Sequence, residues 1–364
     1  MYSTFGWPLL LAPFIPLAIV LDLAGVSPLA IFAVSALGVI PTAAVMGQAT
    51  EQLAERSGPG IGGLLNVTFG NAPELIIALF ALNKGLHEVV KASIIGSILG
   101  NILLVLGVAM VAGGAKRDKQ TFSRTAAGAQ SAMLLLACAA LLMPAIFELV
   151  EGQGLPQPDD ERINYGSTVE HLSLAVAIVL GLTYVAGLLF SLRTHKDIFN
   201  PPYAEEAHEG FGWSVRRAVA MLAIAGAAVG VVSEILVGSI SEASESIGIS
   251  EFFVGIIIVA IVGNAAEHWV AVLVAAKDKM DLAVNIAIGS SAQIALFVAP
   301  LLVLLSFVVG PNPLALVFNG YEIGGVLFAV LIANFVTQEG ESNWFEGVQL
   351  LALYAVLGLV FFYA

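Results

Sequence analysis

Two glutamates lie well inside apolar segments of this chain, each in the same local setting. Asn71 precedes Glu74 by three residues, and Asn264 precedes Glu267 by the same spacing. In a helix that spacing puts each amide on the same face as its carboxylate. A carboxylate at membrane depth is costly, and it is by default a candidate for function.

The apolar segment that follows each glutamate carries more oxygen donors. Ser97 and Asn101 follow Glu74, and Ser290 and Gln293 follow Glu267. Carboxylates, amides and hydroxyls suit Ca2+, which takes about six to eight oxygen ligands in adaptable geometry. The single cysteine and the five histidines argue against a Zn2+ or Cu+ site. The two carboxylates together match the charge of one divalent cation.

Protons are the natural competitors for this site. When the cation leaves, burial and the like charge of the second carboxylate both favour the protonated form. The site would then cross the membrane loaded with Ca2+ or with protons, and rarely as an empty dianion.

The glycines beside the two asparagines, Gly70 and Gly263, belong to the predicted site as well. Pro73 donates no backbone hydrogen bond and clashes with the carbonyl of the residue four positions earlier. A carbonyl freed at membrane depth is tolerated where it lines a cavity or binds an ion. Ala266 stands in the place of Pro73 in the second motif, so a shallower break is predicted there.

Four further side chains are candidates for proton relay or accessory roles. His268 points about 100° away from Glu267 around a helix, so it could relay protons or form an ordinary interhelical hydrogen bond. Glu51 and Glu242 follow apolar segments and could line the mouths of a pathway, although solvated helix ends are the simpler interpretation. Glu234 lies deeper in its segment.

Composition identifies the bilayer as the solvent of this chain. Of 364 residues, 59% are hydrophobic and 11% are charged, against about 25% charged in soluble domains. The net charge of -13 argues against nucleic-acid partners. Apolar runs long enough to cross a membrane predict an all-α protein with eleven transmembrane helices. They lie near residues 7–25, 28–49, 60–83, 88–113, 125–149, 168–192, 215–240, 251–276, 282–308, 315–337 and 345–363.

Basic residues predict the orientation. Eleven of the 14 lysines and arginines fall on the side shared by the N-terminus and the loops that follow even-numbered helices. By the positive-inside rule the N-terminus is cytoplasmic and the C-terminus is outside.

An internal repeat organises the chain. Residues 70–103 align without gaps on residues 263–296, with ten of the 34 positions identical. The copies begin five helices apart, and an odd number inverts the second copy. Inverted halves are a recurrent plan of secondary transporters, with the substrate near the midplane. The predicted organisation is a leading helix at 1–27, one five-helix repeat at 28–195, an acidic linker at 196–214 and a second repeat at 215–364.

The motifs resemble the two signature repeats of the calcium/proton exchanger (CAX) family, part of the cation/Ca2+ exchanger superfamily. The resemblance rests on FGNAPELIIALFALNKG with GSILGNILLVLG, on VGNAAEHWVAVLVAAKDKMD with AIGSSAQIALF, and on the tail EGESNWFEGVQLLALY. It implies that Glu74 and Glu267 are the essential cation-binding and protonatable acids. It also implies ligand or lining roles for further residues. These are Asn71, Asn264, Ser97, Asn101, Ser290, Gln293 and His268.

The sequence departs from the family pattern at two places. Gln48 stands where the family usually has a glutamate, and Gly238 where an aspartate is expected, while Glu234 is retained. Fewer accessory acids leave the number of protons per cation open.

The predicted function is a secondary antiporter that exchanges Ca2+ for H+ by alternating access, with no enzymatic activity and no cofactor. Its predicted partners are the transported ions Ca2+ and H+ and the lipid bilayer. Whether the protein forms a homo-oligomer is left open. Localisation is predicted as a prokaryotic plasma membrane. A Na+/Ca2+ exchanger is the nearest alternative, and a cation channel or a membrane metalloenzyme are the more distant ones.

Overall fold

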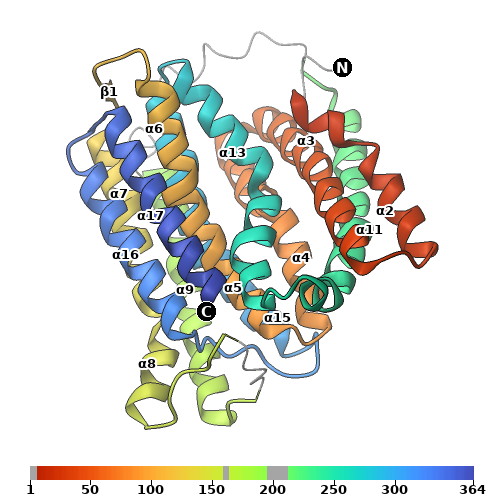
Figure 1. Ribbon diagram of the computed structural model, residues 1–364. Helices are drawn as coiled ribbons and strands as arrows, with labels where there is room; N and C mark the ends of the chain where they lie inside the picture. The colour runs from red at the N-terminus through yellow and green to blue at the C-terminus, as the bar shows by residue number, and fades with distance from the viewer. Residues whose placement is uncertain (1–5, 159–163, 195–211) are drawn as a thin grey trace.

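The computed structural model is predominantly helical and describes residues 6–158, 164–194 and 212–364 (Figure 1). Most of the predicted acidic linker, residues 196–211, lies outside the described residues. The first part of the chain forms η1 (Trp7–Leu11), α2 (Phe14–Leu23), α3 (Pro28–Gly70), α4 (Ala72–Asn83), α5 (His87–Leu99), η2 (Gly100–Val105), α6 (Leu106–Gly114), β1 (Gln120–Thr121), α7 (Arg124–Leu141), α8 (Met143–Val150), α9 (Ser167–Leu189) and η3 (Phe190–Thr194). The second part forms α11 (Val215–Ile247), α12 (Glu251–Phe253), η5 (Val254–Val259), α13 (Ala260–Ala276), α14 (Met280–Gln293), η6 (Ile294–Val298), α15 (Ala299–Ser306), α16 (Gly320–Thr337), β2 (Glu341–Ser342) and α17 (Trp344–Tyr363).

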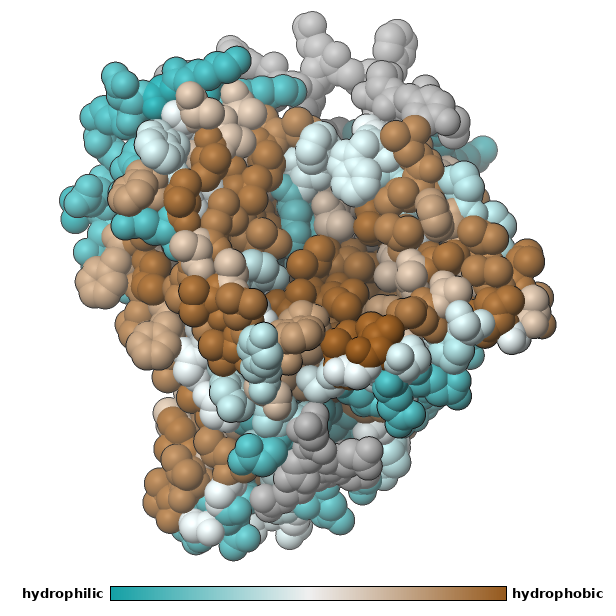
Figure 2. All heavy atoms as spheres, viewed as in Figure 1, coloured by the Kyte–Doolittle hydropathy of each residue, from teal (hydrophilic) through white to brown (hydrophobic). Residues whose placement is uncertain are grey.

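Nine helical segments within the described residues are long and apolar enough to cross a membrane. Figure 2 shows apolar side chains in a broad band across one face, with hydrophilic side chains gathered above and below it. A lipid-facing surface must be apolar in this way because hydrocarbon cannot solvate polar groups. The chain is therefore an integral membrane protein.

Two of the eleven predicted spans are shorter in the structure than the sequence suggested. The first corresponds to the apolar helices at Trp7–Leu23, and the third contributes only the 12-residue helix α4 and the end of α3. The third span is interrupted because Pro73 lies in the first turn of α4, where a missing N–H costs least. Asn71 lies at the break, outside helical geometry.

The predicted difference between the two motifs is confirmed. Whereas the chain breaks at Asn71, α13 runs unbroken through Gly263 and Ala266. The second motif has its irregularity one turn earlier, in the π-helical segment η5.

Helix α3 folds back on itself although it is continuous in hydrogen bonding. Leu53 and Leu65 pack into one hydrophobic cluster, and Met46 and Phe69 pack into the next. In a straight helix Met46 and Phe69 would be about 35 Å apart at 1.5 Å per residue, too far to share a cluster. The helix therefore bends between Leu53 and Leu65, and the chain returns toward the middle of the bundle with Gly70 at its end.

Helix α5, with η2 and α6, forms a buried rod through the centre of the bundle. Its side chains Ile95, Ile98 and Ile102 are almost inaccessible, and the rod contacts α13, α14, α16 and α17. A rod packed on so many sides is a rigid support for the polar residues that it carries toward the two glutamates.

Three loops contact one another at the end of the bundle that carries most of the basic residues. Strands β1 and β2 pair antiparallel, and the Gln120 side chain donates to the backbone of Ala275 at 3.0 Å. Arg117 forms an ion pair with Asp278 at 3.3 Å. These contacts join the loop before α7, the loop after α13 and the loop before α17.

Candidate functional site

The two predicted glutamates meet at one helix crossing. A Cβ atom added to Gly263 would lie 3.2 Å from Cγ of Glu74, and one added to Gly70 would lie 3.7 Å from Oε1 of Glu267. The side chain of each glutamate thus lies over the glycine of the other motif. The absence of a side chain at these two glycines gives each carboxylate the room to approach the opposite backbone.

The two asparagines reach across in the same reciprocal way. Asn71 Nδ2 donates to Gln293 Oε1 at 2.9 Å, and Asn264 Nδ2 donates to Ser97 Oγ at 3.0 Å. Asn264 Nδ2 also donates to the carbonyl of Ala260 at 2.9 Å. Both asparagines therefore use their amide nitrogens as donors to residues of the other motif.

Several of these oxygens are buried without a partner. Oδ1 of Asn71, Oδ1 of Asn264 and Oε2 of Glu74 have no hydrogen-bond partner among the described residues. Such orphaned acceptors are costly and rare in native structures, and an ion is one of the few explanations. Two unsatisfied amide oxygens beside two carboxylates are the kind of donor set that a hard cation requires.

Glu267 is anchored where Glu74 is not. Ser290 Oγ donates to Glu267 Oε2 at 2.9 Å, which supports the ionised form of that carboxylate. Ser97, which occupies the equivalent position in the first motif, instead accepts from Asn264. The two carboxylates are consequently not equivalent in this structure.

His268 turns away from the crossing and pairs with another helix. Its Nε2 lies 3.1 Å from Oδ1 of Asn101. This contact is the interhelical hydrogen bond that was one of its two predicted roles, and a proton relay stays a prediction. Nδ2 of Asn101 is buried without a partner among the described residues.

A π-helical segment follows the site serine in each half. η2 begins three residues after Ser97 and η6 begins four residues after Ser290. The offset of 193 that aligns the two sequence motifs also aligns these segments to within one residue. Such segments are frequent at functional sites because they displace backbone carbonyls from the regular ladder.

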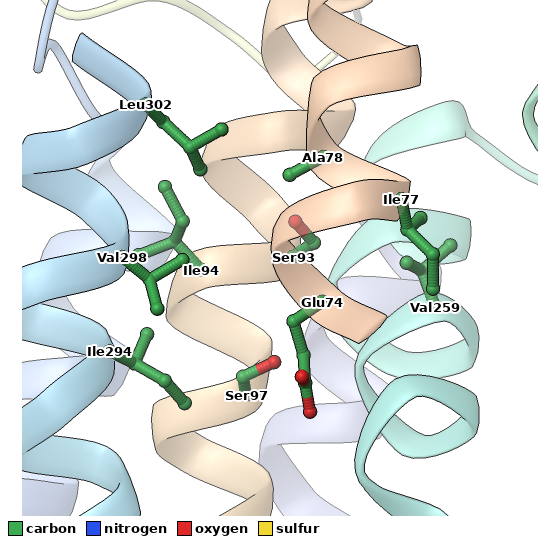
Figure 3. A pocket seen from close by; sticks show the side chains of 10 residues that line it. All are labelled: Glu74, Ile77, Ala78, Ser93, Ile94, Ser97, Val259, Ile294, Val298 and Leu302. Atoms are coloured by element: carbon green, nitrogen blue, oxygen red, sulfur yellow. The ribbon is translucent and has the colours of Figure 1, made fainter. Parts of the chain in front are cut away.

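A narrow cavity extends from Glu74 along one side of α5. Figure 3 shows Glu74 and Ser97 at one end of it, with Ser93 farther along and Leu302 at the other end. The remaining lining is apolar. It consists of Ile77, Ala78, Ile94, Val259, Ile294 and Val298.

The accessory acids lie apart from the crossing. Glu234 and Glu242 line a separate cavity between α2 and α11, together with Asp22 and Lys84. Glu51 is exposed on α3. No hydrogen bond between described residues connects these acids with Glu74 or Glu267, so their accessory roles stay predictions.

Gly238 lies in the same separate cavity, opposite a lysine. A Cβ atom added to it would lie 3.0 Å from Nζ of Lys84. The aspartate expected at this position would therefore face the Lys84 ammonium.

The structure also reveals a buried charged group that the sequence reasoning missed. We call Glu88, Lys91 and Glu322 the outer charge cluster. Lys91 Nζ lies 2.5 Å from Glu88 Oε1 and donates to the carbonyl of Val317 at 2.7 Å. Glu322 is fully buried, and its carboxylate accepts from the backbone of Asn319 at 2.8 Å.

Two sequence signals could have pointed to this cluster. Glu88 and Lys91 are three residues apart, the spacing of a helical ion pair. Asn319 and Glu322 have the spacing of a capping box, which the structure contains. Neither pair was among the predicted site residues: Glu88 begins the predicted span 88–113, and Glu322 lies inside the predicted span 315–337.

Comparisons with known proteins place the chain in a family. A family model described as sodium/calcium exchanger protein matches residues 27–193 and 217–363. The Ca(2+)/H(+) antiporter ChaA of Bacillus subtilis is 43% identical over 97% of this chain and 98% of its own length. A Ca(2+)/H(+) antiporter of Synechocystis is 41% identical over 98% of this chain and 96% of its own.

Solved structures give the same result. Native YfkE superimposes with a TM-score of 0.81 at 39% identity, covering 98% of this chain and 99% of that one. The H+/Ca2+ exchanger CAX shares the fold, with a TM-score of 0.70 at 14% identity over 98% of this chain and 91% of that one. The resemblance to calcium/proton exchangers noted in the sequence is confirmed, and the chain belongs to the sodium/calcium exchanger protein family.

Proposed function

We propose that this protein is a secondary antiporter, not an enzyme, that exchanges Ca2+ for H+ across a membrane. The observation that carries the proposal is the helix crossing at which two glutamates meet unsatisfied asparagine oxygens. The names of relatives that are 41% and 43% identical over nearly the whole chain, Ca(2+)/H(+) antiporters, support the same function.

The proposed site contains the two carboxylates of Glu74 and Glu267 and the oxygens of Asn71 and Asn264. Ser97, Ser290, Gln293 and Asn101 surround it. No lysine or arginine among the described residues pairs with either glutamate. Charge balance at this depth must then come from what is transported, either one divalent cation or protons. Competition for the same oxygens couples the two fluxes, because each occupant must leave before the other binds.

The proposed architecture follows the sequence repeat. We infer eleven membrane crossings, with residues 1–27 leading, 28–195 and 215–364 as inverted halves, and 196–214 as the linker between them. The basic residues favour a cytoplasmic N-terminus and an external C-terminus. The bacterial relatives are consistent with a prokaryotic plasma membrane.

Uptake of radioactive Ca2+ into proteoliposomes with an imposed pH gradient tests the function. We expect uptake to follow the gradient without Na+, and to fall by about 100-fold or more in Glu74→Gln and Glu267→Gln, as expected when a charged ligand is lost. Glu151→Gln, an exposed carboxylate at the end of α8, is the matched control and should transport normally. Uptake that needs Na+ would identify a Na+/Ca2+ exchanger instead, and normal uptake in both site variants would contradict the site.

A further inference from the structure

A groove lies between α2 and α11, away from the helix crossing that holds the two glutamates. Figure 1 shows these two helices next to each other at one edge of the bundle. They meet over Gly38 of α3, where an added Cβ atom would lie 3.2 Å from Cγ1 of Val232 and 3.4 Å from the carbonyl oxygen of Phe14. Toward the end of the bundle with few basic residues, they leave a cavity of about 730 Å3. Proteins bind small molecules in cavities of about 300–1,000 Å3.

The apolar part of the groove is open to the lipid that surrounds the helices. Leu23 is 81% exposed and Val231 is 45% exposed, and both belong to helices at the edge of the bundle. The apolar lining consists of Ile19, Leu23, Val26, Ile31, Val231 and Ile235. A hydrocarbon chain could therefore enter from the side and lie along the groove.

The groove also contains charges of both signs that do not pair with one another. Nζ of Lys84 would lie 3.0 Å from a Cβ atom at Gly238, one helical turn from Glu234 and one turn from Glu242. Asp22 lines the groove from the side of α2. All four charged side chains are exposed, and none of them belongs to an ion pair between described residues. An unpaired ammonium beside unpaired carboxylates fits a ligand that itself carries both signs of charge.

Glu234 lies deepest of the three carboxylates. It precedes Glu242 by eight residues, about 12 Å along the helix at 1.5 Å per residue, within a helix long and apolar enough to cross a membrane. A carboxylate that faces hydrocarbon is costly, so it requires water or a cation beside it. A small inorganic cation would satisfy Glu234 but would leave the apolar lining uncovered, whereas an amphiphile with an ammonium group covers both.

We propose that this groove binds a zwitterionic phospholipid of the phosphatidylethanolamine class. The lipid phosphate lies at Lys84, its ammonium lies among the carboxylates, and an acyl chain follows the apolar lining. Contacts between ionised partners of this kind are the stronger class of hydrogen bond. An anionic phospholipid lacks the ammonium and meets three carboxylates against one lysine, so it binds less well. This lipid site is independent of the proposed transport function.

Gly238 provides the sharpest variant. In Gly238→Asp the new carboxylate faces Lys84, gives it a permanent partner and takes the place of the lipid phosphate. Gly238→Ala is the matched control, because its Cβ atom meets only the flexible end of the Lys84 side chain.

Native mass spectrometry of the delipidated protein in detergent measures lipid dissociation constants. The probes are phosphatidylethanolamine and phosphatidylglycerol with identical acyl chains. We expect phosphatidylethanolamine to bind at least about tenfold more tightly. Gly238→Asp and Lys84→Gln should each weaken it about tenfold, as expected when a hydrogen bond to a charged group is lost. Gly238→Ala should bind within about twofold of the wild type. Lys277→Gln, which removes an exposed lysine at the opposite end of the bundle, should do the same.

Two further arms test the other parts of the lipid. Glu234→Gln should reduce the preference for phosphatidylethanolamine over phosphatidylglycerol to about threefold or less, because one partner of the ammonium is lost. Glycerophosphoethanolamine, the headgroup without acyl chains, should compete at least about 100-fold more weakly than the lipid, since it leaves the apolar lining uncovered.

The contrary outcomes are distinct. Equal affinity for the two lipids in the wild type, or unchanged affinity in both Lys84→Gln and Gly238→Asp, would show ordinary surrounding lipid and overturn the proposal. Competition by glycerophosphoethanolamine as strong as that of the lipid would identify a headgroup site without a place for the acyl chain, and would also overturn it. None of these measurements follows Ca2+ or H+, so their failure is separate from a failure of the uptake test.

Discussion

The central crossing and the outer charge cluster both bury carboxylates, yet they balance charge differently. In the outer cluster the Lys91 ammonium lies 2.5 Å from Glu88 and donates to the carbonyl of Val317 at 2.7 Å. At the crossing, Glu74 and Glu267 have no such cation among the described residues, and Oε2 of Glu74 has no partner at all. The Glu88 carboxylate thus has a lysine of its own, whereas the two carboxylates at the crossing form no ion pair with a lysine or arginine among the described residues.

This difference separates a structural charge from a transporting one. A buried carboxylate that is already paired with a lysine does not need a transported cation to balance its charge. Removing one partner of such a pair leaves the other as an unpaired buried charge. A carboxylate pair without a lysine binds and releases cations because no protein group competes permanently for its oxygens. Burial alone therefore does not distinguish the two regions, whereas the lack of an ion-pair partner among the described residues at the crossing supports the proposed transport site.

Removing the lysine of the outer cluster should have the largest effect on stability. Lys91→Met removes the ammonium that lies 2.5 Å from the buried Glu88 carboxylate, and we expect a loss of about 3–5 kcal/mol in the free energy of unfolding. Thermal unfolding in detergent measures it. Glu267→Gln should leave stability unchanged or raise it, because no protein cation loses a partner.

The double variant Lys91→Met with Glu88→Gln is the control, and it should recover part of the loss. If Lys91→Met unfolds like the wild type, the cluster is not an essential ion pair and the comparison with the crossing loses its basis.

The sequence predicted the crossing but not the outer charge cluster. The matched Asn and Glu of the two motifs identified the crossing, because polar residues repeated at a fixed offset stand out in an apolar chain. The outer cluster was missed because Glu88 begins a predicted span, where charge is ordinary, and because Glu322 has no counterpart at the repeat offset that would have drawn attention to it. Their burial depends on α5, α16 and the segment around Val317 coming together, which no local pattern specifies.

The break in the third span and the packing of α5 against η5 show the same limit. Pro73 predicted the break in the third span, and the structure has that break at Asn71. The close approach of α5 and η5, where a Cβ atom on Gly96 would overlap the carbonyl oxygen of Ile256, could not be predicted, since the sequence carries a glycine at both Gly96 and Gly289. Which of two symmetric contacts is formed is a property of the conformation, not of the motif.

Ca2+ itself should distinguish the two regions by stabilising only one of them. A cation that binds the folded protein adds about 2.7 kcal/mol at 100 times its dissociation constant. We expect this protection at alkaline pH in the wild type and in Glu322→Gln, and none in Glu267→Gln. Protons compete for the same carboxylates, so the protection should decline as pH falls.

Melting temperatures with and without Ca2+ across a pH series measure this effect, with Mg2+ as the control ion. Protection that survives in Glu267→Gln, or that grows as pH falls, would mean that Ca2+ binds elsewhere.

A smaller effect should come from the hydroxyl that supports Glu267. Ser290 donates to its carboxylate at 2.9 Å, which favours the ionised form that binds Ca2+. In Ser290→Ala the proton is harder to displace, so the pH of half-maximal Ca2+ uptake should rise by about one unit, equivalent to about 1.4 kcal/mol. Ser291→Ala is the matched control, because that hydroxyl donates to Ala287 within its own helix at 2.8 Å. Equal pH profiles for the two variants would contradict the role of Ser290.

The smallest effect is expected at the cap of the outer cluster. Asn319 Oδ1 accepts from the backbone of Glu322 at 2.9 Å at the start of α16, and Asn319→Ala should cost about 1 kcal/mol, as for other N-caps. Asn343→Ala removes the corresponding cap of α17, away from the cluster, and should cost a similar amount. Neither variant should alter the pH profile of Ca2+ uptake, because the outer cluster keeps its own cation and exchanges nothing. A profile displaced by Asn319→Ala and not by Asn343→Ala would show that the outer cluster takes up protons during transport, and the distinction between the two regions would fail.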